Sequence, residues 1–531
     1  MIPVGVAGEY LVCRLPASPP MDSRPQPELE PVGLDWKLSS LQVGLLLGLV
    51  LLGRLCALYS CPLYDDAFIT LRYAKNLSDG AGMIFNPAAP WEPILGTTTA
   101  GFCVFLALFL KFGFDPVHTV LALDVALDLA SAAMLVALFR RRLIPTTVTL
   151  VLFALLPQIA RIGVGGMESP FLVALLLGAA LAWRSKRAAL TGLFVAIACT
   201  VRPEAVLFTV PFGWRFLRTD RKAFLRYAGV IAVVGIVSAG ALTAFYGDPF
   251  PQSVKAKSTT HSSSDWSEDL GRVGEILRQA FLPTLWLFAL VPVALFGCLR
   301  SLKERSGLHL FGVAALLQVS SYLLARPHTW GWYYYLPLCA WTVWLGIGVE
   351  RAWAHYFADR DSTGAQRFAN VALAVGVVLS GLGAVFVSKQ NPDLVTRNVY
   401  APMEALVSEL GITPETRIVA SDIGAIAYYA DCLVIDSEGL TWPGALEYRG
   451  DGPGMMTAQV DIIDAERPDF CVFVAEAPRV AIFRGKPNLA SSYEPVARLN
   501  VAGDETLDPS LESLPPHWKQ DYLVYRRRPA K

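Results

Sequence analysis

The chain has 531 residues, of which 54% are apolar and only 17% are charged. Soluble domains carry about 25% charged residues. A mean hydropathy of +0.44 over this length therefore excludes a disordered or collagen-like chain and indicates a polytopic membrane protein. The 45 basic and 45 acidic residues balance, which argues against a nucleic-acid partner. The expected partners are membrane lipid and ligands of the polar loops.

Residues 1–38 are predicted to form a disordered tail on the cytoplasmic side. The stretch 15–31 is crowded with prolines and charges and cannot bury enough apolar surface to fold. The first long apolar run begins only near Leu41 and lacks a small-residue cleavage site after it, so no signal peptide is expected.

Residues 39–388 alternate apolar runs with short polar joints and are predicted to form the transmembrane domain. If every run crossed the membrane, the basic cluster 140–142 and all later basic clusters would face outward, against the positive-inside rule. The short run 97–113 is therefore assigned to a juxtamembrane or re-entrant helix. The prediction is a mostly α-helical protein with about 11 transmembrane helices and a first external loop at 60–116.

Residues 389–531 are more polar and are predicted to form a small extracytoplasmic α/β domain. Three short apolar segments are typical of strands, and one segment of a helix: Arg417–Ala420, Cys471–Val474 and Tyr522–Tyr525 as strands, and Met403–Leu410 as part of a helix. Cys432 and Cys471 either form a disulfide in an oxidising space or stay as two separately buried thiols.

Asp65 and Asp66 form the strongest local signal, because two adjacent carboxylates at a membrane boundary are costly unless they face water, a metal or a substrate. In one interpretation they cap the helix that follows at Ala67–Leu77. In the other, one carboxylate is a general base toward an acceptor hydroxyl, while its neighbour orients it or shares a divalent cation. The two interpretations are equally supported by the spacing.

The stretch DDAFITLRYAKNLSDGAGMIFNP from Asp65, followed by ILGTTT ending at Thr99, resembles the first external loop of bacterial GT-C glycosyltransferases that use polyprenyl-phosphate sugars. The mycobacterial terminal arabinofuranosyltransferases are the members to which it is most usefully compared. Further segments continue the resemblance in the same order along the chain: Gly166–Ser169, Arg202–Glu204, Tyr246–Asp248 with Pro251–Lys257, and Asp422–Tyr429.

The resemblance implies a bacterial plasma (inner) membrane enzyme. It would transfer a sugar, with inversion, from a polyprenyl monophosphate to an extracytoplasmic glycan, lipid or protein. By that analogy Asp65 or Asp66 is the base, and the sequence does not choose between them. Ala100–Gly101 stands where a proline-containing helix start is expected, and Trp91–Leu95 departs from the pattern as well. These departures concern the acceptor more than the reaction type.

Several other polar residues are candidates for substrate binding. Lys255 and Lys257 suit a lipid phosphate as point charges, and ordinary snorkelling at the membrane boundary explains either lysine equally well. Arg202 is either a second phosphate contact or the partner of Glu204 in an ion pair that closes a helix joint. Glu168 either binds an acceptor hydroxyl or, as the better-supported interpretation, caps the helix that starts at Ser169.

Two candidates lie near aromatic or turn residues. Arg326 and His328 precede an aromatic run, 330–335, that is typical of an interfacial belt; in the minority interpretation they contact a phosphate or leaving group. Asp422 fits a strand-to-turn corner, unless the C-terminal domain folds over the active site as a lid.

The rival hypothesis is a lipid or solute transporter without glycosyl transfer. It predicts charged residues deep inside membrane spans, and Asp124 and Asp128 lie four apart on one face of an apolar run. The chain carries no phosphate-binding P-loop and no dinucleotide glycine fingerprint. A donor already activated as a lipid phosphate needs neither.

Overall fold

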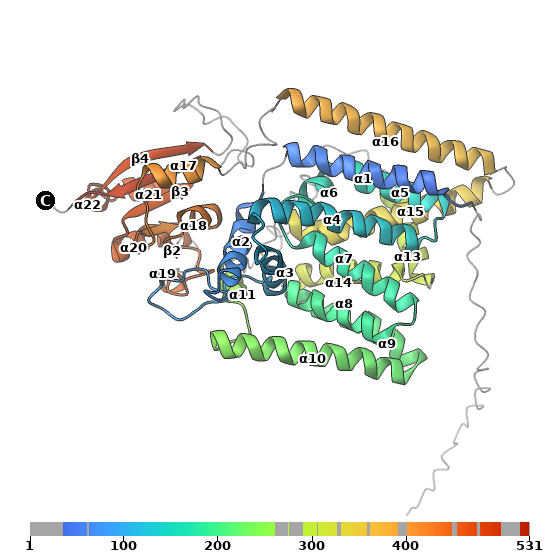
Figure 1. Cartoon of the computed structure of the whole chain (residues 1–531), viewed down its shortest axis with the longest axis horizontal. Coiled ribbons are helices and arrows are strands. Elements are labelled where there is room, and N and C mark those ends of the chain that lie inside the picture. Colours follow the sequence, from blue (N-terminus) through green and yellow to red (C-terminus); the bar gives the residue numbers. More distant parts are fainter. Residues whose placement is uncertain are drawn as a thin grey trace, which may run out of the picture.

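The computed structural model describes residues 36–529 except for 61–62, 261–273, 275–289, 305, 326–330, 358–361, 391–400, 449–453, 475–477 and 501–520. Figure 1 shows a bundle of helices that run side by side, with an α/β domain at one end of the bundle. The segment that leads into the first helix lies at the opposite end. The predicted tail 1–38 falls mostly outside the described residues, but Lys37 forms a bridge with Arg142 and Leu38 is buried.

Ten helices build the bundle in the described part of the chain. They are α1 (Ser40–Ser60), α4 (Pro116–Leu138), α5 (Leu143–Leu155), α7 (Ser169–Arg184), α8 (Ala188–Val201), α10 (Arg221–Tyr246), α13 (Val291–Lys303), α14 (Leu308–Ala325), α15 (Tyr335–Phe357) and α16 (Ser362–Gln390). Other elements lie between them: α2 (Asp65–Ser78), α3 (Ala100–Leu110), α6 (Pro157–Ile162), η1 (Pro203–Phe208), α9 (Thr209–Thr219), α11 (Gln252–Thr260) and η3 (Gly331–Tyr334).

Local sequence explains where several of these elements begin. Proline stands in the first turn of α4, α6, α7 and η1, where its missing N–H costs nothing. Asp115 accepts from the amide of His118 at the start of α4, and Asp220 accepts from the amides of Lys222 and Ala223 at the start of α10. The apolar sequence 144–160 does not form one continuous helix, because it is broken at Pro157 into α5 and α6.

The exposed surface of the bundle is apolar. Among the described residues three helices are long and apolar enough to cross a membrane: Ser40–Leu58, Pro116–Leu138 and Arg221–Tyr246. On α10, Val233, Ile236 and Val237 are 62–72% exposed, which is costly in water but favourable against lipid acyl chains. The helix α3 has 11 residues and is too short to cross, because a span needs about 20. The expected total of about 11 spans stays a prediction.

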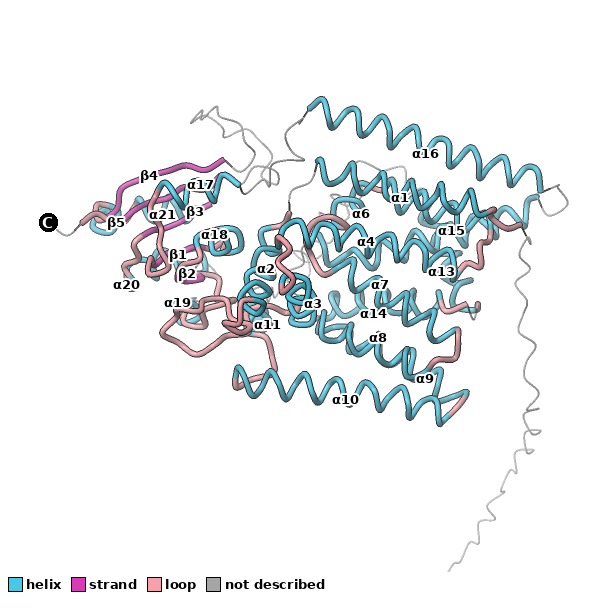
Figure 2. The backbone as a smooth tube through the Cα atoms, viewed as in Figure 1, coloured by secondary structure: helices cyan, strands magenta, loops and turns pink. Residues whose placement is uncertain are grey.

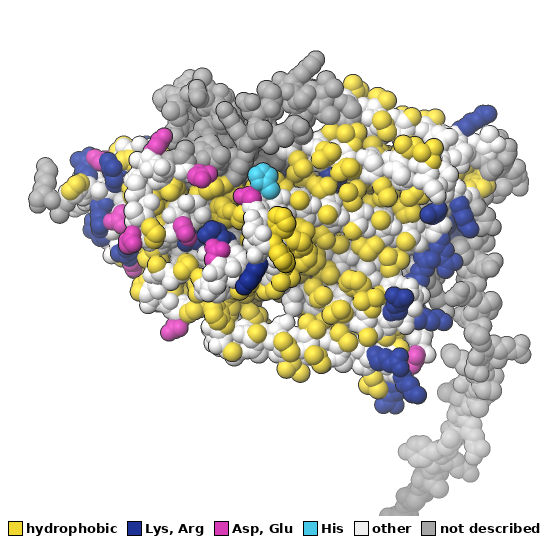
Figure 3. Space-filling model, in the orientation of Figure 1, with side chains coloured by type: hydrophobic (Ala, Val, Ile, Leu, Met, Phe, Trp, Pro, Cys, Tyr) yellow, Lys and Arg dark blue, Asp and Glu magenta, His cyan; other side chains and the backbone are white. Residues whose placement is uncertain are grey.

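Charge is distributed unevenly between the two ends of the bundle. In Figure 3 the visible lysines and arginines of the bundle gather at the end away from the α/β domain, and apolar side chains cover the belt between the two ends. This polarity agrees with the positive-inside rule if the α/β domain lies outside the cytoplasm.

The tail domain contains a five-stranded sheet in the order β2-β1-β3-β5-β4. Its strands are β1 (Arg417–Ala420), β2 (Leu433–Asp436), β3 (Phe470–Val474), β4 (Tyr493–Asn500) and β5 (Asp521–Arg527). The first three pair in parallel, and β5 and β4 add an antiparallel edge. Its helices are α17 (Ala401–Glu409), α18 (Gly424–Ala430), α19 (Ala445–Tyr448), α20 (Gly454–Glu466), α21 (Pro478–Arg484) and α22 (Pro487–Ala490). The predicted strands and helix of this domain are confirmed.

The two cysteines of the tail domain are separately buried thiols, so the disulfide interpretation is wrong. Cys471 lies on β3 and Cys432 immediately precedes β2, while β1 runs between these two strands. Two strand spacings amount to about 9–10 Å, beyond the roughly 7 Å that a disulfide can bridge between Cα atoms.

Candidate functional site

The start of α2 meets the start of α18 at the boundary between the bundle and the tail domain. Asp65 accepts hydrogen bonds from the backbone amides of Gly424, at 2.9 Å, and Ala425, at 2.8 Å, so both of its carboxylate oxygens are engaged. Of the two interpretations that the spacing left open, the helix cap is not found: α2 begins at Asp65 itself without a side-chain cap. Asp65 instead occupies the amino end of a different helix.

Gly424 is required at this junction by space rather than by backbone angle. A methyl group on Gly424 would lie 1.9 Å from the carbonyl oxygen of Asp65, far inside van der Waals contact. Glycine is therefore the residue that lets α18 approach α2 closely enough for its amides to reach the carboxylate.

Other contacts hold the tail domain over the first loop. The Asn86 side chain exchanges two hydrogen bonds with the backbone of Val434, at 2.9 and 3.2 Å. Buried Arg72 donates to the carbonyl oxygen of Cys432 at 2.8 Å, and Phe68 packs against Tyr428 with ring centroids 5.4 Å apart. Figure 2 shows the same arrangement, with α18 and the loops of the tail domain beside α2. The lid interpretation is therefore the one this geometry favours.

The junction concentrates negative charge. Burial and the neighbouring Asp422 raise the pKa of Asp65 to about 8, although the two amides oppose the shift. Burial and the nearby charge of Asp66 likewise raise the pKa of Asp422 to about 6. Asp422 lies on the loop between β1 and α18 and accepts from the Tyr522 hydroxyl at 3.3 Å. Asp422 thus joins two carboxyl groups that lie more than 350 residues away in the sequence, and the three interact electrostatically.

A metal site was expected only as an option shared by Asp65 and Asp66. Within the described residues, no group of three or more His, Cys, Asp and Glu side chains is arranged to hold a metal ion.

Aromatic rings connect this junction to a second polar cluster. Tyr64, next to Asp65, packs against Trp332 with ring centroids 4.7 Å apart. Trp332 stacks on Tyr333, and the guanidinium of Arg202 lies over the Tyr333 ring at 4.2 Å. Part of the aromatic run 330–335 is thus packed inside the protein instead of forming only an interfacial belt.

Arg202 is the centre of that second cluster. Its guanidinium contacts Glu168 at 2.6 Å and Glu204 at 2.7 Å, and it donates to the Tyr322 hydroxyl at 2.7 Å. Gln318 donates to Glu204 and to Tyr322, and Tyr322 donates to Glu204. Two carboxylates neutralise the single guanidinium, which favours the structural ion pair over a phosphate contact.

Glu168 does not cap α7, contrary to the better-supported expectation from the sequence. It stands at the cap position, but its side chain makes no capping hydrogen bond, because Arg202 draws the carboxylate away. Its second oxygen, Oε2, is buried without a hydrogen-bond partner among the described residues. That oxygen is an acceptor available to a ligand hydroxyl.

Among the remaining predicted binding residues, Lys255 is described and joins neither cluster. Lys255 pairs with Asp248 at 2.6 Å on the surface, where both side chains are more than 40% exposed. Such a pair is worth less than about 1 kcal/mol and can open for a phosphate. Lys257 lies on α11, but its side chain is outside the described residues, as are Arg326 and His328.

Asp124 and Asp128, on which the transporter hypothesis depends, are fully buried on α4. Asp128 pairs with Arg54 and accepts from the Tyr335 hydroxyl at 2.5 Å. Asp124 accepts from the Gly166 amide at 2.9 Å. Both carboxylates therefore hold neighbouring elements together.

Sequence reasoning missed Gly424, Ala425, Arg72 and Asn86 as parts of the junction. The segment around Gly424 was noted only as part of the resemblance and as a turn, since an amide donor leaves no residue-type signature. The available signals were Arg72 on a partly apolar helix and Asn86 in the loop that follows it, because buried polar side chains need partners.

Comparisons with known proteins support the fold and leave the tail domain unnamed. The chain is similar to ArnT from Cupriavidus metallidurans, solved in the apo state, a GT-C glycosyltransferase, with a TM-score of 0.55 and 12% identity, over 91% of this chain and 97% of that one. At that identity the likeness shows the fold, and the fold expected from the resemblance is confirmed. Residues 396–525 match a family described as a domain of unknown function, DUF8728. No curated protein matches the chain.

Proposed function

We propose that this protein is a membrane glycosyltransferase of the GT-C type that moves a sugar from a polyprenyl monophosphate to an extracytoplasmic glycan, lipid or protein. The proposal rests on one combination of observations: an ArnT-like fold along nearly the whole chain, with a carboxylate of raised pKa in the first external loop. The named neighbour uses an undecaprenyl-phosphate sugar, which suggests the donor class. The compartment that fits is the bacterial plasma membrane.

Asp65 is the better candidate for the base than Asp66. The amides of Gly424 and Ala425 fix the orientation of its carboxylate, and each oxygen keeps a further lone pair for a proton. A pKa of about 8 makes Asp65 a stronger base than an ordinary carboxylate and places its ionisation near the working pH. In this assignment Asp66 and Asp422 supply the negative charge that raises that pKa.

The reaction is a single in-line displacement. Ionised Asp65 takes the proton of the acceptor hydroxyl while the acceptor oxygen forms a bond to the anomeric carbon from the face opposite the phosphate. The bond between the anomeric carbon and the phosphate oxygen breaks, and its electron pair leaves with the lipid phosphate. The configuration at the anomeric carbon is inverted, and the proton remains on Asp65 until solvent removes it.

The leaving phosphate gains negative charge and needs cations near it. Our candidates for these cations are Lys255, Lys257, Arg326 and His328. All four belong to polar segments of the sequence that the charge distribution assigns to the same side as α2. The ion pair of Arg202 and Glu204 stabilises the segment in which these two residues lie. The unpaired Oε2 of Glu168 is the candidate contact for a sugar or acceptor hydroxyl.

The test is sugar transfer from a panel of radiolabelled polyprenyl-phosphate sugars in membranes that carry the wild type, Asp65→Asn or Asp66→Asn. We expect Asp65→Asn to lower the rate by about 100- to 10,000-fold, the usual contribution of a general base. Asp66→Asn, the matched control, keeps the helix and the adjacent position and should retain most of the rate.

Two results contradict the proposal at different levels. If Asp66→Asn abolishes transfer and Asp65→Asn does not, the enzyme class stands and the base is Asp66. If both variants transfer normally, or no donor in the panel is used while cells without the gene fail to export a lipid, the transporter hypothesis replaces the enzyme.

A further inference from the structure

An open cavity of about 570 Å³ lies at the end of the bundle opposite the tail domain. It sits between α1 and α4, and four basic residues rim it: Lys37, Arg140, Arg141 and Arg184. Among the described residues that line it, none is acidic. The cavity lies at the opposite end of the bundle from Asp65, so the proposed transfer reaction does not use it.

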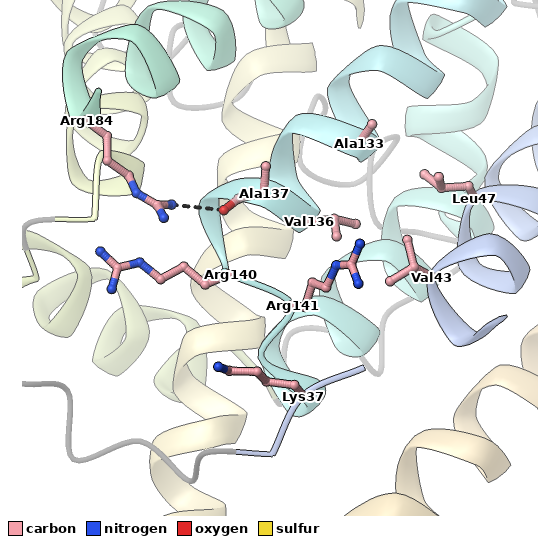
Figure 4. Close-up of a pocket in the computed structure, with 9 residues that line it drawn as sticks. All are labelled: Lys37, Val43, Leu47, Ala133, Val136, Ala137, Arg140, Arg141 and Arg184. Carbon is pink, nitrogen blue, oxygen red and sulfur yellow. Dashed lines mark hydrogen bonds between the residues drawn. The ribbon is translucent and has the colours of Figure 1, made fainter. Parts of the chain in front are cut away.

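The four cations come from separate segments. Lys37 precedes α1, Arg140 and Arg141 form the turn after α4, and Arg184 ends α7. In Figure 4, Arg140 extends to the side of Arg184, and Arg141 lies on the other side, beside the apolar wall. Basic residues scattered at the cytoplasmic ends of helices orient a membrane protein without binding one particular lipid. Here all four line one hollow, which a topological signal alone does not require.

The four cations differ in whether their side chains already have hydrogen-bond partners among the described residues. Arg184 donates to the carbonyl oxygen of Ala137 at 2.9 Å, the contact drawn in Figure 4, and Arg141 reaches Ser40 at 3.4 Å. Lys37 and Arg140, by contrast, have no ion-pair or side-chain hydrogen-bond partner within the described part of the chain. Their charges are available to an anion.

The turn that presents the arginines is strained. Arg140 and Arg141 have φ angles of 55° and 59°, in the left-handed region where a side chain with a β-carbon is disfavoured. Glycine would make the same turn without that cost. The turn is nevertheless held in place, because the amide of Leu38 donates to the Arg141 carbonyl at 2.8 Å. This turn therefore holds two charged side chains at backbone angles that residues with a β-carbon disfavour.

The wall of the cavity is apolar. Val43 and Leu47 of α1 face Val136 of α4, and two alanines on α4 leave the space between the helices. In Figure 4 the guanidinium of Arg141 lies beside Val43 and Val136, so charge and apolar surface adjoin. A free phosphate would use only the rim, whereas a phospholipid uses both parts.

We propose that this cavity binds one anionic phospholipid, with its phosphate at the basic rim and an acyl chain along α1 and α4. Several cations around one phosphate attract it as point charges, and the apolar wall contributes burial of the chain. The occupant is distinct from a polyprenyl-phosphate donor, which would be used on the opposite face.

The experiment measures lipid retention by the full-length protein in detergent, by intact-protein mass spectrometry with added phosphatidylglycerol or phosphatidylcholine. Arg140→Gly removes one charge and relieves the strained turn, so it does not threaten folding. We expect its affinity for phosphatidylglycerol to fall about fivefold, and that of Arg140→Gly with Lys37→Gln to fall about 30-fold. Phosphatidylcholine should be retained weakly by every variant.

The matched control is Lys222→Gln, which removes an exposed charge at the start of α10 on the same face but outside the cavity. It should bind phosphatidylglycerol as the wild type does. The proposal is overturned if this control loses as much affinity as Arg140→Gly, which would indicate diffuse attraction. It is also overturned if phosphatidylcholine binds equally well, or if millimolar inorganic phosphate displaces the lipid fully.

Discussion

Two groups of ionisable side chains lie at the same end of this protein, and they differ in how their charge is balanced. Around Arg202, two carboxylates, a phenol and an amide close on one guanidinium, leaving a single buried oxygen of Glu168 unpaired. Around Asp65, burial and the charges of Asp422 and Asp66 raise the pKa of Asp65, burial and Asp66 raise that of Asp422, and the donors to Asp65 are neutral amides. Both groups are polar and buried, so burial alone does not distinguish a structural cluster from a catalytic one. The balance of charge distinguishes them.

A compensated cluster stabilises one arrangement of helices and has little left to offer a substrate. Arg54 with Asp128 and Tyr335 is a second cluster of that kind, deeper in the bundle. In an uncompensated cluster the excess negative charge raises the affinity of a carboxylate for a proton, and a general base needs that affinity. Four expected outcomes test this difference, beginning with the largest effect.

Arg202→Met removes the cation from the compensated cluster and leaves Glu168 and Glu204 buried without their partner. The expected loss is about 3–5 kcal/mol in the free energy of unfolding, measured by thermal or denaturant unfolding in detergent. Adding Glu168→Gln and Glu204→Gln should restore much of that loss, because no charge then remains unpaired. If Arg202→Met is as stable as the wild type and only the KM for the donor rises, Arg202 is a phosphate contact.

Gly424→Ala places a methyl group against the backbone of Asp65 and should push α18 away from α2. The expected cost is about 1–3 kcal/mol, with faster hydrogen exchange in α18 and slower sugar transfer. Gly229→Ala on α10 is the control, because a methyl group there meets nothing within 4 Å and alanine favours a helix. Unchanged exchange in α18 of the Gly424 variant would mean that the junction is not closely packed in the membrane.

The raised pKa of Asp65 makes docking of the tail domain depend on pH. The folded state binds this proton more tightly than the unfolded state, so the contribution is fully present below the ordinary aspartate pKa of about 4. It is lost as the pH rises toward about 8. Limited proteolysis or hydrogen exchange should show weaker docking at high pH. Asp65→Asn should flatten that dependence, and an unchanged slope would assign it to another group.

Under the same titration the rate of sugar transfer should rise with pH as Asp65 ionises. Activity and docking thus respond in opposite directions to one proton. A transfer rate that falls over the same interval would argue against Asp65 as the base.

The strands of the tail domain could be predicted from the sequence because they follow local patterns. Arg417–Ala420 is a strand with the predicted limits, and the short run 97–113 contains a helix too short to cross. Neither the cap that the sequence allowed on α2 nor the one it favoured on α7 is formed, and the reason is shared. Asp65 and Glu168 both had local amides within reach, but tertiary partners, Gly424 and Arg202, took their carboxylates instead. Propensity describes what a side chain can do nearby, and it gives no weight to a partner that is distant in sequence.

The sequence by itself determined that this is a membrane protein, which segments are apolar, and that two adjacent carboxylates follow the first apolar run. These properties depend on composition and on neighbours a few residues apart. Only the tertiary structure decided that Asp65 faces α18 and that Asp422 lies within its electrostatic reach. It also decided that Arg202 is neutralised by Glu168 and Glu204. The energy of a buried charge depends on which groups the fold brings to within a few ångströms, and Asp65 and Gly424 are 359 residues apart in the chain.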